Sequence, residues 1–350
     1  MTINSPHNDA IAADARPDGH RAIPRERVGI LLVNLGTPDA ATPAAVKRYL
    51  REFLSDERIV DLPRALWLPI LHGVILNVRP AATAKNYAKI WRTESNESPL
   101  RYFTRTQAEK LATRMGDEII VDWAMRYGSP SIRDQITAMK EQGVTRLVVA
   151  PLYPQYSATT TASVTDAVFA ALADMRWQPA LRIAPPFHDD PAYIAALAEV
   201  TRVHIAALGW QPERVLLSYH GLPERYLLAG DPYYCHCAKT SRLLRAQMGW
   251  SEDFAPLVFQ SKFGREKWLE PATEATLKEL GAQGVKRVAV ITPAFVSDCI
   301  ETLEEIAITG REVFLEAGGE ALAAIPCLND KDPMIDLLET LMRRESAGWI

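Results

Sequence analysis

Short apolar runs alternate with longer segments of helical period along most of the chain. The runs are rich in valine, isoleucine and leucine and end at glycine or proline, which is typical of buried parallel strands. Strands are predicted at 27–34, 118–125, 146–150, 181–183, 214–219, 257–259, 287–293 and 325–328. Helices are predicted at 43–54, 98–115, 131–142, 162–175, 191–208, 238–248, 270–283, 297–309 and 333–344. The alternation of strand and helix predicts an α/β fold with parallel sheets.

The pattern contains an internal repeat. The segments GVTRLVVAPLYPQYS (143–157) and GVKRVAVITPAFVSD (284–298) share an apolar strand, a proline and a loop that leads to a helix. RVGILLVNLGTP and RVLLSYHGLP resemble each other more weakly. We therefore expect two similar Rossmann-like domains whose parallel sheets face a central cleft. The cleft would be lined by the carboxyl ends of the strands, where open α/β sheets bind their ligands.

Four parts of the chain are expected from these patterns. They are a disordered tail (1–26), a first domain (27–185), a second domain (186–330) and a C-terminal helix (331–350).

One segment of the first domain does not fit the alternation. Residues 59–79 read IVDLPRALWLPILHGVILNVR, which is apolar but interrupted by Pro63, Pro69 and Gly73. The interruptions argue against a core helix. Two interpretations remain: an apolar lip that touches lipid or a greasy ligand, or a loop and helix packed on the domain.

Composition narrows the class of protein. The 350 residues suffice for two domains, and a net charge of -4 argues against a nucleic-acid partner. The four cysteines lack the spacing of a disulfide scaffold, which favours a reducing compartment. The polar start of the chain predicts no secretory signal, and no stretch is expected to span a bilayer.

His220 is the first candidate for chemistry. It ends the predicted strand in VLLSYHGLP (215–223), at the sheet edge where ligands bind. Its imidazole exchanges protons near neutral pH without a large pKa shift. The plain alternative is a histidine that hydrogen-bonds a neighbouring loop. Arg126 follows another predicted strand and so also lies at a carboxyl edge.

A group of carboxylates begins the helix predicted at 297–309. Asp298, Glu301, Glu304 and Glu305 lie there, and Glu301 and Glu305 share one face. They could conduct a divalent cation or protons to a site near His220. Alternatively, Asp298 and Glu301 form a capping box and the acidic residues serve the helix dipole.

Other chemistries find little support. The chain has no dinucleotide-binding glycine motif, no phosphate loop, no His-Glu-x-x-His and no Gly-x-Ser-x-Gly. Cys235-His236-Cys237 does not supply a closed tetrahedral metal site, because its ligands are too closely spaced and no second cysteine pair accompanies them.

Several motifs together resemble the ferrochelatase family, whose members insert ferrous iron into a porphyrin. The similarity runs from about residue 28 to the C-terminal helix. Its motifs are LLVNLGTP (31–38), RYGSP (126–130), YPQYSATTT (153–161), SYHGLPERY (218–226), GDPY (230–233), FQSKFG (259–264) with Trp268, and AFVSDCIETLEE (294–305).

The resemblance implies two Rossmann-like domains around a porphyrin cleft, with the C-terminal helix returning to the first domain. It implies that His220 and Glu301 form the metal-site pair and that Arg126 and Tyr153 lie in the cleft. Asp298 and Glu305 would belong to the path of metal or protons. The lip at 59–79 would form the mouth of the cleft and could touch a membrane surface.

The function implied is insertion of Fe²⁺ into protoporphyrin IX, the terminal step of haem synthesis, by a cytoplasmic enzyme peripherally associated with the inner membrane. Porphyrin and iron are then substrates, and no resident cofactor is required. His220 would accept a pyrrole proton or ligate iron. Lys89 and Arg92 are candidates for binding the substrate propionates. The alternatives are a chelatase for coproporphyrin or another tetrapyrrole, and a non-catalytic haem or metal carrier.

The chain departs from the family at two places. Many members have a histidine where this chain has Cys299. Animal members hold a [2Fe–2S] cluster with a cysteine of the tyrosine-rich loop and a cysteine-rich extension, whereas this chain has Ala158 in that loop and ends at Ile350.

We therefore predict that the purified protein lacks a [2Fe–2S] cluster, as its visible absorption spectrum would reveal. A stoichiometric cluster spectrum that disappears on substitution of Cys235 or Cys237 would contradict this prediction.

Overall fold

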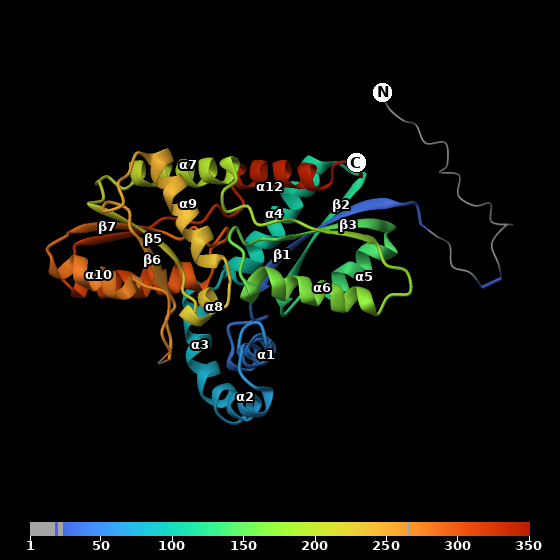
Figure 1. Ribbon diagram of the computed structural model, residues 1–350, viewed down its shortest axis with the longest axis horizontal. Helices are drawn as coiled ribbons and strands as arrows, with labels where there is room; N and C mark the ends of the chain where they lie inside the picture. Colours follow the sequence, from blue (N-terminus) through green and yellow to red (C-terminus); the bar gives the residue numbers. More distant parts are fainter. Residues whose placement is uncertain (1–17, 20–23, 265) are drawn as a thin grey trace.

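The computed structural model describes residues 18–19, 24–264 and 266–350, and two four-stranded parallel sheets form its framework (Figure 1). The first sheet has the order β2-β1-β3-β4 and the second the order β6-β5-β7-β8. Their strands are β1 (Arg27–Gly36), β2 (Ile119–Tyr127), β3 (Val144–Pro151), β4 (Ala180–Ile183), β5 (Arg214–His220), β6 (Leu257–Gln260), β7 (Arg287–Ile291) and β8 (Ala321–Ala324). The tail predicted at 1–26 lies largely outside the described residues.

The strand order confirms the internal repeat. The two strands of the stronger repeat, β3 and β7, occupy the same position in their sheets, and so do β1 and β5 of the weaker one. The predicted α/β class with two similar parallel sheets is therefore correct.

One strand is misplaced in the prediction. Residues 325–328 were expected to form the last strand, but β8 is Ala321–Ala324, paired with β7. Its sequence is nearly all alanine, which has a low strand propensity, so only pairing with β7 makes this segment a strand.

Helices cover both faces of each sheet. They are α1 (Pro43–Leu54), α2 (Arg64–Ile70), α3 (Leu76–Ile90), α4 (Pro99–Met115), α5 (Ile132–Glu141), α6 (Ser163–Ala173), α7 (Pro191–Ala207), α8 (Glu224–Leu228), α9 (Tyr233–Met248), α10 (Thr273–Ala282), α11 (Arg311–Glu316) and α12 (Asp332–Glu345). Three π-helical segments are η2 (Leu71–Ile75), η3 (Ala158–Ala162) and η4 (Glu301–Gly310).

Alternate residues of each central strand point to opposite faces. On β1, Leu31 packs in a cluster with α5 and α6, whereas Ile30 packs in a cluster with α4 and α12. On β5, Leu216 belongs to the cluster of α10 and α11, and Leu217 to that of α7 and α9. The near-continuous apolar runs in the sequence reflect this burial on both faces.

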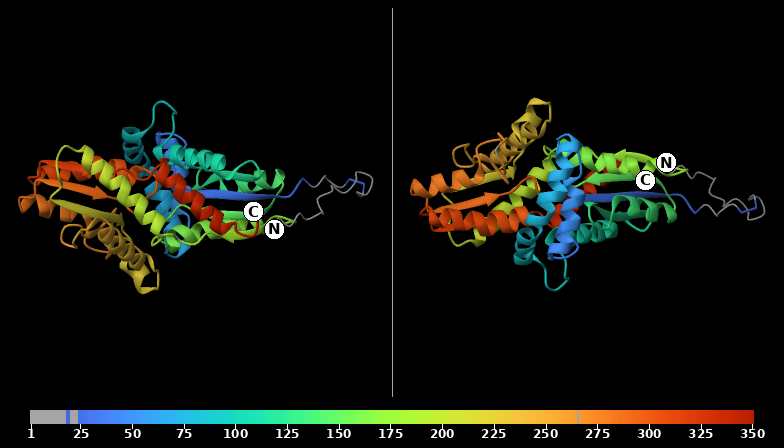
Figure 2. Two further views of the ribbon diagram at one scale, coloured as in Figure 1. Left: turned by 90° about the horizontal axis from the view of Figure 1, so that it is seen from above. Right: turned by 90° about the horizontal axis from the view of Figure 1, so that it is seen from below.

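The two halves share one core. A single buried cluster includes Ile30 of β1 and Leu217 of β5, together with side chains of α4, α7, α9 and α12. Figure 2 shows α7 and α12 following one another across the top of both halves. Because this packing joins the halves on one side, their strand ends are held toward each other.

Residues 59–79 agree with one of the two interpretations, a loop and helix packed on the domain. Apart from its first residues, the segment is helical, through α2, η2 and the start of α3, despite Pro69. Proline removes a backbone donor, and the π-helical turn directly after Pro69 lets the helix continue. Burial of Leu71 and Leu76 in a cluster with α1 stabilises it.

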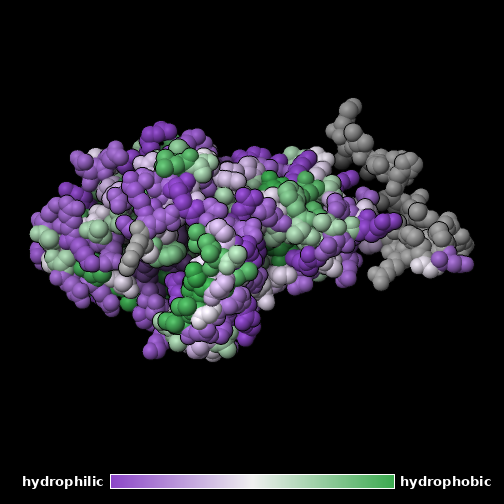
Figure 3. Space-filling model, turned by 60° about the horizontal axis from the view of Figure 1, so that its bottom comes forward, coloured by the Kyte–Doolittle hydropathy of each residue, from purple (hydrophilic) through white to green (hydrophobic). Residues whose placement is uncertain are grey.

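The outer face of this helical run is apolar and exposed. Figure 3 shows apolar side chains gathered on the projection that these helices form. Leu66, Ile70, Val74 and Val78 lie there, with Val78 68% exposed. We call this surface, formed by α2, η2 and the start of α3, the lip. By length and composition, Arg64–Ile90 could cross a membrane, with 17% of its most apolar window buried, so the prediction that no stretch is long and apolar enough is corrected.

Candidate functional site

His220 is the last residue of β5, at the carboxyl edge of the second sheet. Its Nδ1 lies 2.6 Å from the carbonyl oxygen of Gly221. A carbonyl only accepts, so Nδ1 carries the proton of the neutral ring and Nε2 presents its lone pair. The backbone of Gly221 passes close to that of Gln260 because Gly221 has no Cβ: one would lie 2.7 Å from the Gln260 carbonyl oxygen.

Gln260 joins this strand end to the π-helix η4. It ends β6 and pairs with His220 in the register of the two strands. Its Oε1 accepts a hydrogen bond from Ser218 at 2.8 Å, and its Nε2 donates to the backbone oxygen of Glu301 at 2.8 Å. Gln260 therefore lies beside both parts of the site: its backbone is the strand neighbour of His220, and its side chain binds the first residue of η4.

Glu305 is held firmly on the same helix. Its carboxylate accepts hydrogen bonds from the Ser261 N–H and hydroxyl, both at 2.6 Å, and from Gln260 Nε2 at 3.2 Å. Ser261 has a φ of 65°, a left-handed conformation that aims its N–H at this carboxylate. The sequence analysis predicts that Glu305 belongs to the path of metal or protons. In the structure, each of its carboxylate oxygens accepts a hydrogen bond from Ser261.

Asp298 is buried below the start of η4. It accepts hydrogen bonds from Thr302 at 3.0 Å, from the Cys327 N–H at 3.2 Å and from Asn329 Nδ2 at 2.6 Å. The Asp298 N–H donates to Asn329 Oδ1 at 2.8 Å, whereas a capping box would give it to Glu301. Asp298 thus ties η4 to the segment after β8, and the capping box is not formed.

Glu301 lines a small cavity between the halves. The other walls are the end of β1 with Thr37, Tyr49 of α1, Tyr87 of α3, and Cys299. Burial raises the pKa of Tyr87 well above its ordinary value, and the Glu301 carboxylate raises it further. Burial and the same carboxylate also raise the pKa of the Cys299 thiol. Glu301 is thus surrounded by protonated neighbours.

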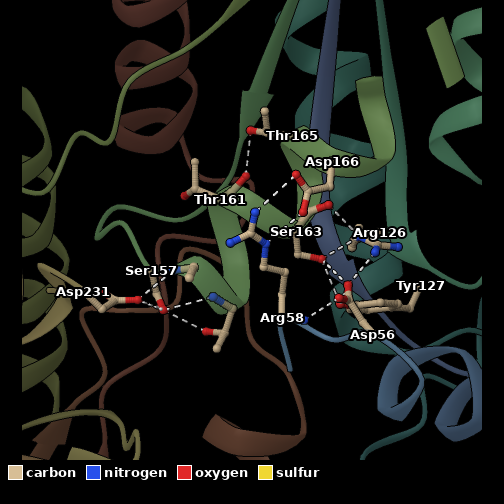
Figure 4. A network of polar contacts seen from close by, with 12 residues as sticks. Asp56, Arg58, Arg126, Tyr127, Ser157, Thr161, Ser163, Thr165, Asp166 and Asp231 are labelled. Carbon is tan, nitrogen blue, oxygen red and sulfur yellow. Dashed lines mark hydrogen bonds and ion pairs between the residues drawn. The ribbon is translucent and has the colours of Figure 1, made fainter. Parts of the chain in front are cut away.

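Arg126 and Tyr153 lie at the carboxyl edge of the first sheet. In Figure 4, Arg126 points at Asp56 and Ser163. It donates to Asp56 at 2.5 Å and to the Ser163 hydroxyl at 2.7 Å. Burial by itself would raise the pKa of Asp56. Hydrogen bonds from Ser163, Tyr127 and the Arg58 N–H lower it, as does the Arg126 charge, so the pKa lies below its ordinary value. The Nε and NH2 groups of Arg126 are therefore held in place by Ser163 and Asp56.

Tyr153 differs from Arg126 in having a free polar atom. Among the residues that the structure describes, its buried hydroxyl has no hydrogen-bond partner. Burial raises its pKa, and the Arg126 charge lowers it in part, so the two side chains are neighbours. Tyr153 also raises the pKa of Tyr49, which Glu301 affects too. Tyr49 is therefore near both Tyr153 and Glu301.

Lys89 is paired within the protein. Its Nζ lies 2.8 Å from Glu304 Oε1, and the lysine side chain is 45% exposed. The ion pair connects α3 to η4. The structure thus links His220, Glu301 and Glu305 through Gln260, places Arg126 and Tyr153 at the strand ends of the first sheet, and uses Asp298 and Lys89 in internal contacts.

Comparison with known proteins identifies the family. The sequence model of the ferrochelatase family matches residues 27–346. The ferrochelatase of Rhizobium meliloti is 53% identical over 333 residues, which is 95% of this chain and 98% of the relative. That of Agrobacterium fabrum is 51% identical over 343 residues, covering 97% of this chain and all of the relative. The chain belongs to the ferrochelatase family.

Solved structures agree on the fold of this ferrochelatase-family chain. SirB from Bacillus subtilis with Fe³⁺ superposes with a TM-score of 0.56 at 11% identity, over 92% of this chain and 97% of SirB. At that identity the likeness concerns the fold alone.

Sequence reasoning missed three residues of the site in this ferrochelatase-family protein. Gln260 could have been found, since it directly follows a predicted strand in FQSKFG, as His220 follows another. Tyr49 and Tyr87 carry no such signal, because they lie inside helices whose packing alone turns them to the cavity.

The positions that bear on a cluster, Ala158 and the four cysteines, can be located as well. Ala158 begins η3, and its N–H donates to Asp231 at 2.7 Å. In the described part of the chain, no three His, Cys, Asp or Glu side chains are grouped as a metal site, and the four cysteines are free thiols.

The contacts of Asp298 and Glu301 predict that substitutions at the two positions lower stability by different amounts. Asp298→Ala should lower the free energy of unfolding by about 3 kcal/mol, because buried donors of Asn329 and Cys327 lose their acceptor. Glu301→Gln should cost at most about 1 kcal/mol, because no capping contact is lost. Thermal unfolding of both variants checks this. Equal melting temperatures would show that Asp298 is not the structural residue of the pair.

Proposed function

We propose that this protein inserts Fe²⁺ into protoporphyrin IX, giving protohaem and two protons, with His220 and Glu301 as the reacting side chains. We assign the reaction from the full-length match to ferrochelatases. That of Allorhizobium ampelinum is 52% identical over 336 residues. Gln260 pairs with the backbone at His220 and hydrogen-bonds the backbone of Glu301, and this proximity supports the choice of residues.

Insertion of iron requires removal of two protons from pyrrole nitrogens. Nε2 of His220 presents the lone pair that can accept one, and the Nδ1–H contact with Gly221 fixes the orientation of the ring. We assign His220 this proton-accepting role. Glu301 supplies a carboxylate oxygen, a ligand type that suits Fe²⁺, beside an uncharged cavity wall.

The flat macrocycle would lie between the lip and the strand ends. Its apolar rings suit the exposed apolar side chains of the lip, and the free hydroxyl of Tyr153 offers a polar contact. We assign substrate binding to Tyr153 and Arg126. Lys89 would bind a propionate only by leaving Glu304, so it is the weakest of the predicted substrate contacts.

The lip also suits contact with a membrane surface. Its exposed apolar side chains are contiguous, and patches of this kind mark protein or membrane contacts. We propose that the protein touches the inner membrane peripherally through this surface, from the cytoplasmic side, where its apolar substrate would arrive.

The reaction is tested with purified protein, Fe²⁺ and either protoporphyrin or coproporphyrin, followed by absorbance. His220→Ala should lower turnover by about 10²–10⁴-fold, the usual cost of losing a proton acceptor, while porphyrin binding persists. Glu301→Gln should lose most of its turnover at a near-native melting temperature. His204→Ala and Glu199→Gln on α7 are matched controls and should behave as the parent protein.

Normal turnover by the His220 variant would refute its assignment. A parent protein that binds porphyrin and iron without forming haem would be a carrier, and faster metallation of coproporphyrin would change the substrate.

Membrane contact is tested by flotation with vesicles of phosphatidylethanolamine and phosphatidylglycerol. Val78→Glu should weaken binding, because it places a charge in the apolar surface. Val203→Glu, at a similarly exposed valine on α7, is the control and should bind as the parent does. Equal flotation of both variants would remove the lip from the membrane contact.

A further inference from the structure

Entry of a tetrapyrrole requires movement near Glu301. The cavity that Glu301 lines offers about 270 Å³, including its open side. Pockets for drug-sized ligands usually measure about 300–1,000 Å³. A macrocycle that contacts Glu301 needs more space than this cavity offers, so contacts between the two halves near the lip are candidates to open as it enters.

Arg225 makes such a contact. It lies on α8, five residues after His220, and its NH1 is 2.6 Å from Asp61 Oδ2 in the segment that leads into the lip. Its Nε is 2.6 Å from Glu266 of the second half. The neighbouring Tyr226 hydroxyl donates to the carbonyl oxygen of Ile59 at 3.4 Å. Two adjacent side chains of α8 thus reach the same short segment of the first half.

The first-half side of this contact is anchored. Asp56 accepts hydrogen bonds from Arg126, Tyr127 and Ser163, and Arg58 pairs with Asp166 of α6 at 2.8 Å (Figure 4). Asp56 lies five positions before Asp61 in the chain, and Arg58 lies three positions before it. The segment that contacts Arg225 is therefore a short extension of a network of hydrogen bonds. Loss of the Arg225 contact would release the lip from the second half and leave this network intact.

The contact is also weak enough to open. The side chains of Arg225 and Asp61 are 38% and 69% exposed. Exposed ion pairs contribute little stability and are screened by salt. The shared core, in contrast, is buried on the opposite side of the molecule and would resist separation.

On the basis of the function proposed above, we propose that Arg225 is a positioning residue that latches the lip to the loop of His220. The Arg225–Asp61 contact opens when the tetrapyrrole enters and again when the product leaves, and it closes between these steps.

The test measures binding of protoporphyrin IX without iron to the full-length protein by stopped-flow fluorescence, together with kcat and KM for iron insertion. Arg225→Ala and Asp61→Asn should each raise the porphyrin dissociation rate by about threefold to fivefold, the size expected from one exposed ion pair. KM should rise in proportion, at an unchanged melting temperature. High salt should raise the rate of the parent protein toward that of the variants and leave the variants unchanged.

Two controls locate the effect. Glu266→Gln removes the partner of Arg225 within its own half, and Arg287→Ala removes an exposed ion pair with Glu213 at the opposite edge of the second sheet. Both should keep the parent rates. Parent-like rates in Arg225→Ala and Asp61→Asn, or a Glu266→Gln variant that matches them, would overturn the latch while the parent still binds porphyrin and forms haem. Failure of the parent protein itself to bind porphyrin would overturn the proposed function and the latch with it.

Discussion

The side-chain amide of Gln260 is the contact on which the candidate site depends. It is buried, and its oxygen and nitrogen are both hydrogen bonded, to Ser218, Glu301 and Glu305. A buried polar network of this kind is stable only when each member is satisfied, so it permits one arrangement of its parts. Because Gln260 is the register neighbour of His220, the pairing of β5 with β6 also decides where the π-helix η4 begins. π-helical segments are rare and occur often at functional sites, which agrees with this placement.

The carboxylates at the start of η4 have the same chemistry and different environments. Asp298 accepts three hydrogen bonds in a buried position and joins two segments of the chain. Glu305 is held by Gln260 and Ser261, and Glu304 pairs with Lys89. Glu301 lines the cavity with Tyr49 and Tyr87, whose pKa values burial raises. Glu301 is thus the member of the group without a structural side-chain contact among those described, which is why we propose it as the reactive one.

The molecule is stiff on one side of this site and loosely joined on the other. The shared core packs α7 and α12 across both halves, where separation would expose buried apolar surface. Across the mouth, the halves meet through side chains that are partly exposed, such as Arg225 and Asp61. We therefore propose that a substrate that needs more room than the cavity provides is accommodated at the lip, while the strand ends that carry His220 keep their positions.

The sequence by itself determined the α/β class, the repeat and the position of His220 at a strand end, because apolar runs and glycine or proline breaks are local patterns. It also indicated Glu301 through the resemblance to ferrochelatases. It left open whether a helix runs through Pro69, because breaker residues are local signals, whereas burial of Leu71 and Leu76 against α1 is a tertiary effect that outweighs them. Only the tertiary structure likewise shows that Asp298 is buried in hydrogen bonds whereas Glu301 lines the cavity. Their spacing fits a capping box, but Asn329, 31 positions along the chain from Asp298, takes the hydrogen bonds instead. Contacts between residues so far apart in the chain leave no periodic trace, so only the folded structure could assign them.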